Sequence, residues 1–171
     1  MADYQHISHG FEPVFDERSR VLVLGSFPSV LSRENHFYYG NPQNRFWRVM
    51  AAVLGEPVPE TGDIEGKCAM LLSHGVALWD VIESCDVRGS SDASIKNVVP
   101  ADVARITSVA PVRTVICNGG TAGRLYRRWL ESSTGLPAVV LPSTSPANAA
   151  WSLERLTACW REALLAVLRA Q

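Results

Sequence analysis

The sequence lacks the cysteine and histidine spacings that bind metals. Its four cysteines, at positions 68, 85, 117 and 159, lie 17, 32 and 42 residues apart, so no C-x-x-C pair exists. This spacing excludes a zinc ribbon or a cysteine-ligated cluster, and it gives no sign of a disulfide framework. The four histidines form no pair four residues apart. We therefore expect no metal site, and we expect a reducing compartment, the cytoplasm.

Long apolar runs are also missing. The longest late run, ALLAVL at 163–168, is far too short to cross a membrane, and the first ten residues lack the basic and apolar regions of a signal peptide. The formal net charge is −1, which implies no strong field for or against nucleic acid. With 171 residues, 47 % of them apolar, the chain is predicted to be one soluble domain over residues 1–171, close to the nucleoid if its source is a prokaryote.

Short apolar strands alternate with amphipathic helices along the chain. Strands are predicted at 20–26, 76–82, 113–118 and 138–143. Helices are predicted at 64–75, 100–110, 121–132 and 152–170, and at 44–55 with Asn44 as its cap. The polar segment 85–97 is predicted to be a surface loop. This alternation favours an α/β fold with a parallel sheet covered by helices on both faces.

The loops that follow the four strands are expected to share one edge of the sheet, where α/β proteins bind ligands. They are rich in serine, asparagine, proline, glycine and aromatic residues, and they span 25–44, 79–87, 118–123 and 141–150. The loop NGGTAG (118–123) lacks the lysine and the glycine spacing of phosphate-binding loops, so a tight turn is the favoured interpretation. Ser29 does not lie in a G-x-S-x-G elbow, which argues against a hydrolase triad.

Three features of these loops each allow two interpretations. In FYYGNPQNRFW (37–47), the tyrosines and amides suit a planar heterocycle, but they could equally fill core gaps and cap a helix. Asp80 could accept a proton from a ring N–H, or it could only form a turn. The segment LPSTSPANA (141–149) could grip phosphates with its hydroxyls and backbone N–H groups, or it could simply connect a strand to a helix.

In this order along the chain, five segments resemble the uracil-DNA glycosylase superfamily, most closely its deoxyinosine (hypoxanthine) glycosylase branch. They are VLVLGSFPS (21–29), FYYGNPQNRFW (37–47), GVALWDV (75–81), TVICN (114–118) and LPSTSPANA (141–149). The resemblance implies a three-layer α/β/α sandwich with a short, mainly four-stranded parallel sheet, and a monomer without cofactor or metal cluster. It also implies a monofunctional enzyme of base excision repair that flips deaminated bases out of double-stranded DNA and removes them by hydrolysis.

The same resemblance assigns roles to individual residues. Asn44 takes the position of the catalytic residue that holds the attacking water. Five residues are expected to bind the base, with Tyr39 stacking on it and Asp80 accepting its ring N–H: Ser26, Phe27, Tyr39, Asp80 and Asn118. Seven residues are expected to contact the DNA: Ser29, Ser143, Thr144, Ser145, Pro146, Ala147 and Asn148.

Two departures from the superfamily pattern leave alternatives open. Phe27 stands where relatives carry a water-orienting Asn or Asp, and Leu141 stands where they carry a histidine. The chain could therefore be a lesion-binding protein without catalysis, or a glycosylase for uracil, xanthine or mismatched bases. A third alternative is a small-molecule α/β protein without a role on DNA. Its rim residues would then give no salt-dependent affinity for DNA phosphates: Ser143, Ser145, Arg33, Arg45 and Arg48.

Overall fold

The computed structural model describes residues 3–89 and 91–170. Its centre is a parallel sheet with the strand order β3-β2-β6-β7, made of β2 (Val21–Gly25), β3 (Val76–Asp80), β6 (Thr114–Asn118) and β7 (Ala138–Leu141). Every residue of β2 and β3 is buried, as expected for central strands with helices on both faces. The predicted four-stranded parallel sheet is confirmed.

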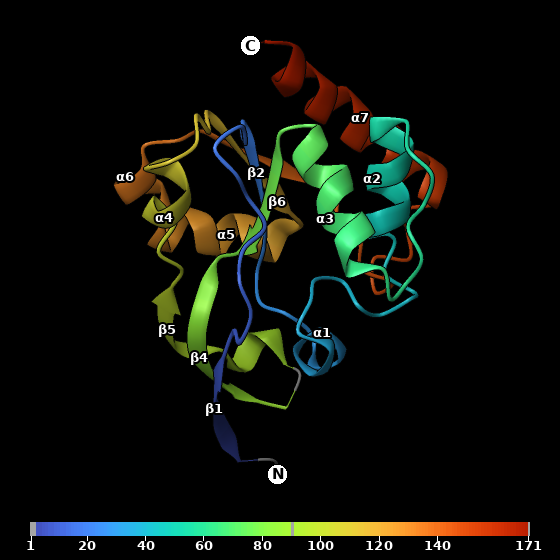
Figure 1. Ribbon diagram of the computed structural model, residues 1–171. Coiled ribbons are helices and arrows are strands. Elements are labelled where there is room, and N and C mark those ends of the chain that lie inside the picture. Colours follow the sequence, from blue (N-terminus) through green and yellow to red (C-terminus); the bar gives the residue numbers. More distant parts are fainter. Residues whose placement is uncertain (1–2, 90, 171) are drawn as a thin grey trace.

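The helices flank this sheet in two layers (Figure 1). On one side lie α2 (Phe46–Leu54), α3 (Ile64–Ser73) and α7 (Leu153–Arg169), and on the other lie α4 (Ala104–Thr107), α5 (Gly120–Trp129) and α6 (Glu131–Thr134). The short α1 (Val30–Asn35) follows the carboxyl end of β2. None of the helices in the described ranges is both long and apolar enough to span a membrane.

A second, antiparallel sheet lies beside the first, and the sequence did not predict it. Its strands β1 (Tyr4–Ser8), β4 (Ile82–Arg88) and β5 (Lys96–Pro100) pair in the order β1-β4-β5. The prediction of a surface loop over 85–97 is therefore wrong at both ends, because 85–88 pair within β4 and 96–97 within β5; its Ser90 lies outside the described residues.

The side-chain pattern of β4 explains this error. Its buried Cys85 and Val87 pack with apolar side chains of the neighbouring strands, whereas Asp86 between them and Arg88 after them are polar. Such alternation is typical of a strand with one buried face, but in the sequence the polar residues conceal it. The segment 76–82, predicted as one strand, belongs to two: β3 ends at Asp80 and β4 begins at Ile82. The helix predicted to begin at Pro100 is also wrong there, because Pro100 is the last residue of β5.

Candidate active site

The loops after the parallel strands enclose a pocket of about 450 Å³, within the usual range of ligand sites. The second sheet lines it on one side through Ile7, Cys85 and Val87, together with Ile95 just before β5. Most of the predicted site residues line this pocket: Ser26, Phe27, Ser29, Tyr39, Asn44, Asp80, Asn118, Ser143, Thr144, Ser145 and Pro146. Ala147 and Asn148 lie outside the lining.

A chain of hydrogen bonds in the pocket wall fixes the direction of two amides. Asn44 Oδ1 accepts from the backbone N–H of Phe46 at 3.0 Å and from the Thr144 hydroxyl at 2.8 Å. Asn118 Oδ1 accepts from the backbone N–H of Thr144 at 3.0 Å, which turns Asn118 Nδ2 toward the hydroxyls of Thr144 (3.0 Å) and Tyr39 (3.1 Å). Backbone N–H groups only donate, so the direction of every bond follows. With Oδ1 occupied, Asn44 has its Nδ2 donor left for a ligand.

Tyr39, which lines the pocket, has a left-handed backbone conformation. Its φ is 51°, a region that tyrosine rarely adopts and that is often found at functional sites. One face of its ring stacks on Phe46, with centroids 4.2 Å apart and planes 22° apart. Burial and the nearby Asp80 carboxyl raise the pKa of Tyr39, so its hydroxyl stays protonated. Because that hydroxyl oxygen accepts from Asn118, its own hydrogen is available to a ligand.

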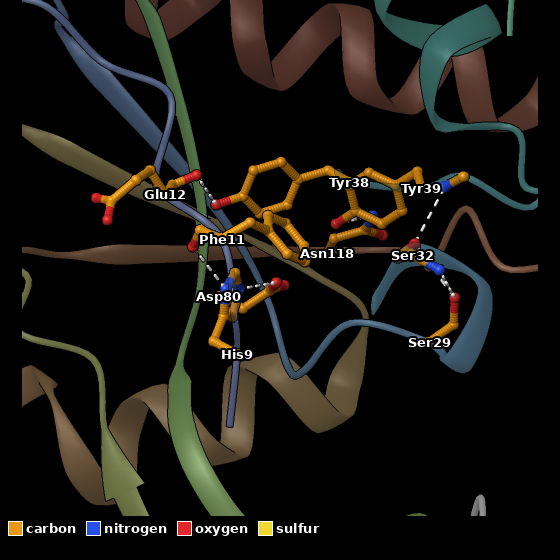
Figure 2. A network of polar contacts seen from close by, with 10 residues as sticks. His9, Phe11, Glu12, Ser29, Ser32, Tyr38, Tyr39, Asp80 and Asn118 are labelled. Atoms are coloured by element: carbon orange, nitrogen blue, oxygen red, sulfur yellow. Dashed lines mark hydrogen bonds and ion pairs between the residues drawn. The ribbon is translucent and has the colours of Figure 1, made fainter. Parts of the chain in front are cut away.

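His9 is the site residue that the sequence analysis missed. Its buried ring places Nε2 2.8 Å from Asp80 Oδ2 and Nδ1 2.9 Å from the carbonyl oxygen of Phe11 (Figure 2). Asp80 is 4 % exposed and lines the pocket, whereas His9 does not line it and contacts Asp80 from behind. No spacing signal points to His9, because its partner lies 71 residues away in the sequence. Within the described ranges, no His, Cys, Asp and Glu side chains gather in a group of three that could hold a metal ion.

Comparison of the sequence with known proteins identifies the family of the chain. The model of the uracil DNA glycosylase superfamily matches residues 12–166. The chain belongs to the uracil DNA glycosylase superfamily. A Methanosarcina acetivorans protein named hypoxanthine DNA glycosylase is 35 % identical over 149 residues, which are 87 % of this chain and 93 % of that protein. A Methanosarcina barkeri protein of the same name is 33 % identical over 155 residues, 90 % of this chain and 96 % of that protein.

A solved structure has the same fold as this superfamily member. The solution NMR structure of a Methanosarcina acetivorans protein, described provisionally as a uracil DNA glycosylase, has a TM-score of 0.74 and 34 % identity. The match covers 92 % of this chain and 98 % of that one. The resemblance inferred from the five sequence segments and the predicted three-layer α/β/α class are thereby confirmed.

Phe27, which departs from the superfamily pattern, has a packing role in this structure. Its ring packs against the apolar cluster under the second sheet and meets the His9 ring edge-on, with centroids 6.2 Å apart and planes at 89°. A phenyl ring has no acid, base or hydrogen-bonding group. Phe27 therefore adds to the apolar surrounding of the His9 ring, and the polar chemistry of this superfamily site rests on other residues.

The predicted DNA contacts that follow β7 form a tightly bonded loop. Ser143 Oγ accepts from the backbone N–H of Ser145 at 3.1 Å, and Ser145 Oγ accepts from that of Ala147 at 3.2 Å. Asn148 Nδ2 donates to the Ser143 carbonyl at 3.0 Å, and Pro146 and Ala147 are exposed at the tip. Asn148 thus shapes the loop from inside. On the opposite wall, the predicted contact Ser29 caps α1 by accepting from the backbone N–H of Ser32.

Arg45 holds this loop in place. Its guanidinium donates to four backbone carbonyls, those of Thr144 (3.4 Å), Ser145 (2.9 Å), Asn148 (3.1 Å) and Trp151. Four of its five N–H donors are therefore engaged within the protein, which disfavours the hypothesis that Arg45 contacts DNA phosphates. Arg45 is also the residue directly before α2, and its side chain makes no capping bond.

Arg45→Lys is expected to loosen the loop, because one ammonium group cannot replace the planar guanidinium at four carbonyls. We expect the free energy of unfolding to fall by about 1–3 kcal/mol, and amide hydrogens of residues 143–151 to exchange faster. Urea denaturation and hydrogen exchange measure the two effects. Arg161→Lys is the matched control, because among the described residues Arg161 donates to one backbone carbonyl, that of Ala52, at 3.3 Å. Equal effects of the two substitutions would contradict the assigned role.

Proposed function

We propose that this protein is a monofunctional DNA glycosylase that removes hypoxanthine from double-stranded DNA and leaves an abasic site, acting as a monomer without a cofactor. Two relatives named hypoxanthine DNA glycosylase, each matching most of the chain, support this proposal. The observation that carries it is the buried Asp80 carboxyl in the pocket, beside Gly25 and backed by His9.

The proposed recognition step uses the difference between hypoxanthine and adenine. Hypoxanthine pairs poorly with thymine, so its extrusion from the duplex costs less than that of an intact base. Its ring N1–H is a donor that Asp80 accepts. Adenine has a bare nitrogen at that position, and its lone pair would face the carboxyl oxygen. A buried site penalises such a mismatch by about 1–3 kcal/mol.

The proposed hydrolysis step uses Asn44. The C1′–N9 bond breaks with its electron pair leaving on the base, which generates an oxocarbenium-like sugar that the DNA phosphates stabilise. Water held by Asn44 Nδ2 then forms the new C–O bond at C1′, and its surplus proton passes to solvent. Because the cation is highly electrophilic, Asn44 needs to position water and does not need to be a strong base. The loop 141–150 is proposed to hold the flanking phosphates with its hydroxyls and backbone N–H groups.

Base release from duplexes that each carry one deoxyinosine, deoxyuridine or deoxyxanthosine tests this function. We expect deoxyinosine to be cleaved fastest, with the abasic product revealed by alkaline strand scission. Uracil presents a similar N–H and carbonyl edge, so dominant cleavage of the deoxyuridine duplex would indicate a uracil glycosylase instead. Binding of a lesion duplex without an abasic product would indicate a lesion-binding protein that has lost catalysis.

A further inference from the structure

We propose that two groups in this pocket recognise the lactam edge of a deaminated base, which is an N–H donor beside a carbonyl. Asp80 Oδ1 accepts from the N–H, and the Tyr39 hydroxyl donates to the carbonyl. His9 and Asn118 fix the directions of these two bonds from behind. This inference rests on the proposed function and deepens it, because it changes Tyr39 from a stacking residue into a hydrogen-bond donor and assigns a role to His9.

The contacts of His9 determine which oxygen of Asp80 can carry a proton. The Phe11 carbonyl oxygen only accepts, so the 2.9 Å contact places a hydrogen on His9 Nδ1. The 2.8 Å contact between His9 Nε2 and Asp80 Oδ2 holds one further hydrogen, on one atom or the other. In both arrangements Asp80 Oδ1 carries no hydrogen and remains an acceptor.

Burial excludes the arrangement in which His9 is an imidazolium and Asp80 Oδ1 is protonated. The two side chains are 0 % and 5 % exposed. The rings of Phe11, Phe27 and Tyr38 lie around the imidazole, with centroids 4.4, 6.2 and 5.8 Å from it. That arrangement would leave an uncompensated positive charge in this apolar surrounding, which is strongly unfavourable. His9 is therefore a positioning residue that keeps Asp80 Oδ1 an acceptor.

Asn118 fixes the direction of the Tyr39 hydroxyl in a similar way. The backbone N–H of Thr144 engages Asn118 Oδ1, so it is Asn118 Nδ2 that donates to the Tyr39 oxygen, at 3.1 Å. The hydroxyl hydrogen then points away from Asn118, and burial keeps it on the oxygen by raising the pKa of Tyr39. Tyr39 therefore presents a donor to the pocket.

Gly25 brings the acceptor and the donor to one place. A Cβ on Gly25 would lie 2.4 Å from Asp80 Oδ1 and 2.9 Å from the Tyr39 hydroxyl oxygen, so both oxygens face the space above this glycine. A base edge seated there meets an acceptor and a donor side by side. Single-point recognition by Asp80 detects only the ring N–H, whereas this pair detects the carbonyl as well.

The pair separates the products of deamination from their parents. Hypoxanthine, xanthine and uracil each present an N–H beside a carbonyl, which matches both groups. Adenine and cytosine present a bare ring nitrogen beside an amino group, which mismatches both. Guanine has the lactam edge of hypoxanthine, and its three hydrogen bonds to cytosine keep it in the stack because extrusion costs more. The substrate class is therefore bases with a lactam edge in weak pairs.

Tyr39→Phe tests the donor, because it keeps the ring on Phe46 and removes only the hydroxyl. Release of hypoxanthine from a deoxyinosine duplex under single-turnover conditions is expected to fall about 10- to 100-fold. Release of purine from a deoxynebularine duplex, which has neither the N1–H nor the carbonyl, is expected to change less than about threefold. An unchanged ratio of the two rates would mean that Tyr39 acts only by stacking, and would overturn the donor assignment.

His9→Phe and His9→Gln test the acceptor. The first removes both ring nitrogens, and the second keeps a donor for Asp80 Oδ2. The measured quantity is the rate of hypoxanthine release from deoxyinosine divided by the rate of purine release from deoxynebularine. We expect His9→Phe to lower this ratio about 10- to 100-fold. In His9→Gln the ratio is expected to be at least about fivefold higher than in His9→Phe. His6→Phe is the matched control, because His6 makes an exposed 2.8 Å contact with Asp86 outside the pocket, and its ratio should equal that of the wild type.

The outcomes separate this inference from the proposed function. A wild-type protein that releases no base from the deoxyinosine, deoxyuridine or deoxyxanthosine duplexes overturns both. The wild-type protein could instead release hypoxanthine normally while both His9 variants lose the same factor on the deoxyinosine and the deoxynebularine duplexes. That result overturns the inference alone, because a merely structural role of His9 lowers the two release rates together. If His9→Phe does not fold, the rate ratio of His9→Gln and the ¹⁵N spectrum of the wild-type histidines still test the role of His9. We expect a hydrogen on His9 Nδ1, and a bare Nδ1 would contradict the proton assignment.

Discussion

Asn44→Ala is expected to lower the single-turnover rate of hypoxanthine release about 100- to 1000-fold, the usual cost of removing one preorganised polar group from an active site. The substitution removes the Nδ2 donor that is proposed to hold the attacking water. It also removes the oxygen that accepts from Phe46 and Thr144. The free energy of unfolding is therefore expected to fall by about 1–2 kcal/mol, so rates are to be compared at a temperature where both proteins are fully folded.

Gln43→Ala provides the matched control for this experiment. Gln43 is an exposed amide adjacent to Asn44 in the chain, and it does not line the pocket. Its substitution should leave both the rate and the unfolding transition unchanged. If Asn44→Ala kept more than about a tenth of the wild-type rate, the loss would be too small for the group that positions the nucleophile, and Asn44 would have to be reassigned to a structural role.

The parallel sheet and the location of the site could be predicted from the sequence for one physical reason. Central strands of a parallel sheet are buried on both faces, so they appear as continuous apolar runs such as Val21–Gly25 and Val76–Asp80. The carboxyl ends of such strands meet at one edge, which places the polar loops after them around one pocket. The pocket indeed contains residues from all four loops, among them Asn44, Asp80 and Thr144.

The second sheet and the His9 contact could not be predicted, because both depend on pairing between distant segments. The strand Tyr4–Ser8 carries mainly polar, exposed residues and is held by its register with Ile82–Arg88. That register brings His9 beside Glu83, whose carbonyl accepts the His9 backbone N–H at 2.8 Å. A single histidine in a polar stretch gives no sign of a buried partner such as Asp80. Local patterns report burial, but they do not report which side chains meet.

Gly25→Ala is expected to abolish base release while most of the fold persists. The added Cβ would lie 2.4 Å from Asp80 Oδ1, and Asp80 has little freedom to move because His9 holds its other oxygen. The methyl group would also fill the space in which the base edge is proposed to sit. We expect the rate on deoxyinosine to fall at least about 100-fold, since small displacements of binding groups have effects of that size. Overpacking should lower the free energy of unfolding by about 1–3 kcal/mol.

Gly62→Ala is the control that separates the loss of the pocket from the mere addition of a methyl group. A Cβ on Gly62 meets no atom within 4 Å, so neither stability nor rate should change. Binding of a deoxyinosine duplex gives the decisive second measurement for Gly25→Ala. If the base no longer fits, non-specific affinity through the phosphates should persist while the preference for the lesion over an undamaged duplex disappears. If Gly25→Ala still preferred the lesion duplex but no longer cleaved it, the base would have to bind elsewhere. The space above Gly25 would then not be the site of the base edge.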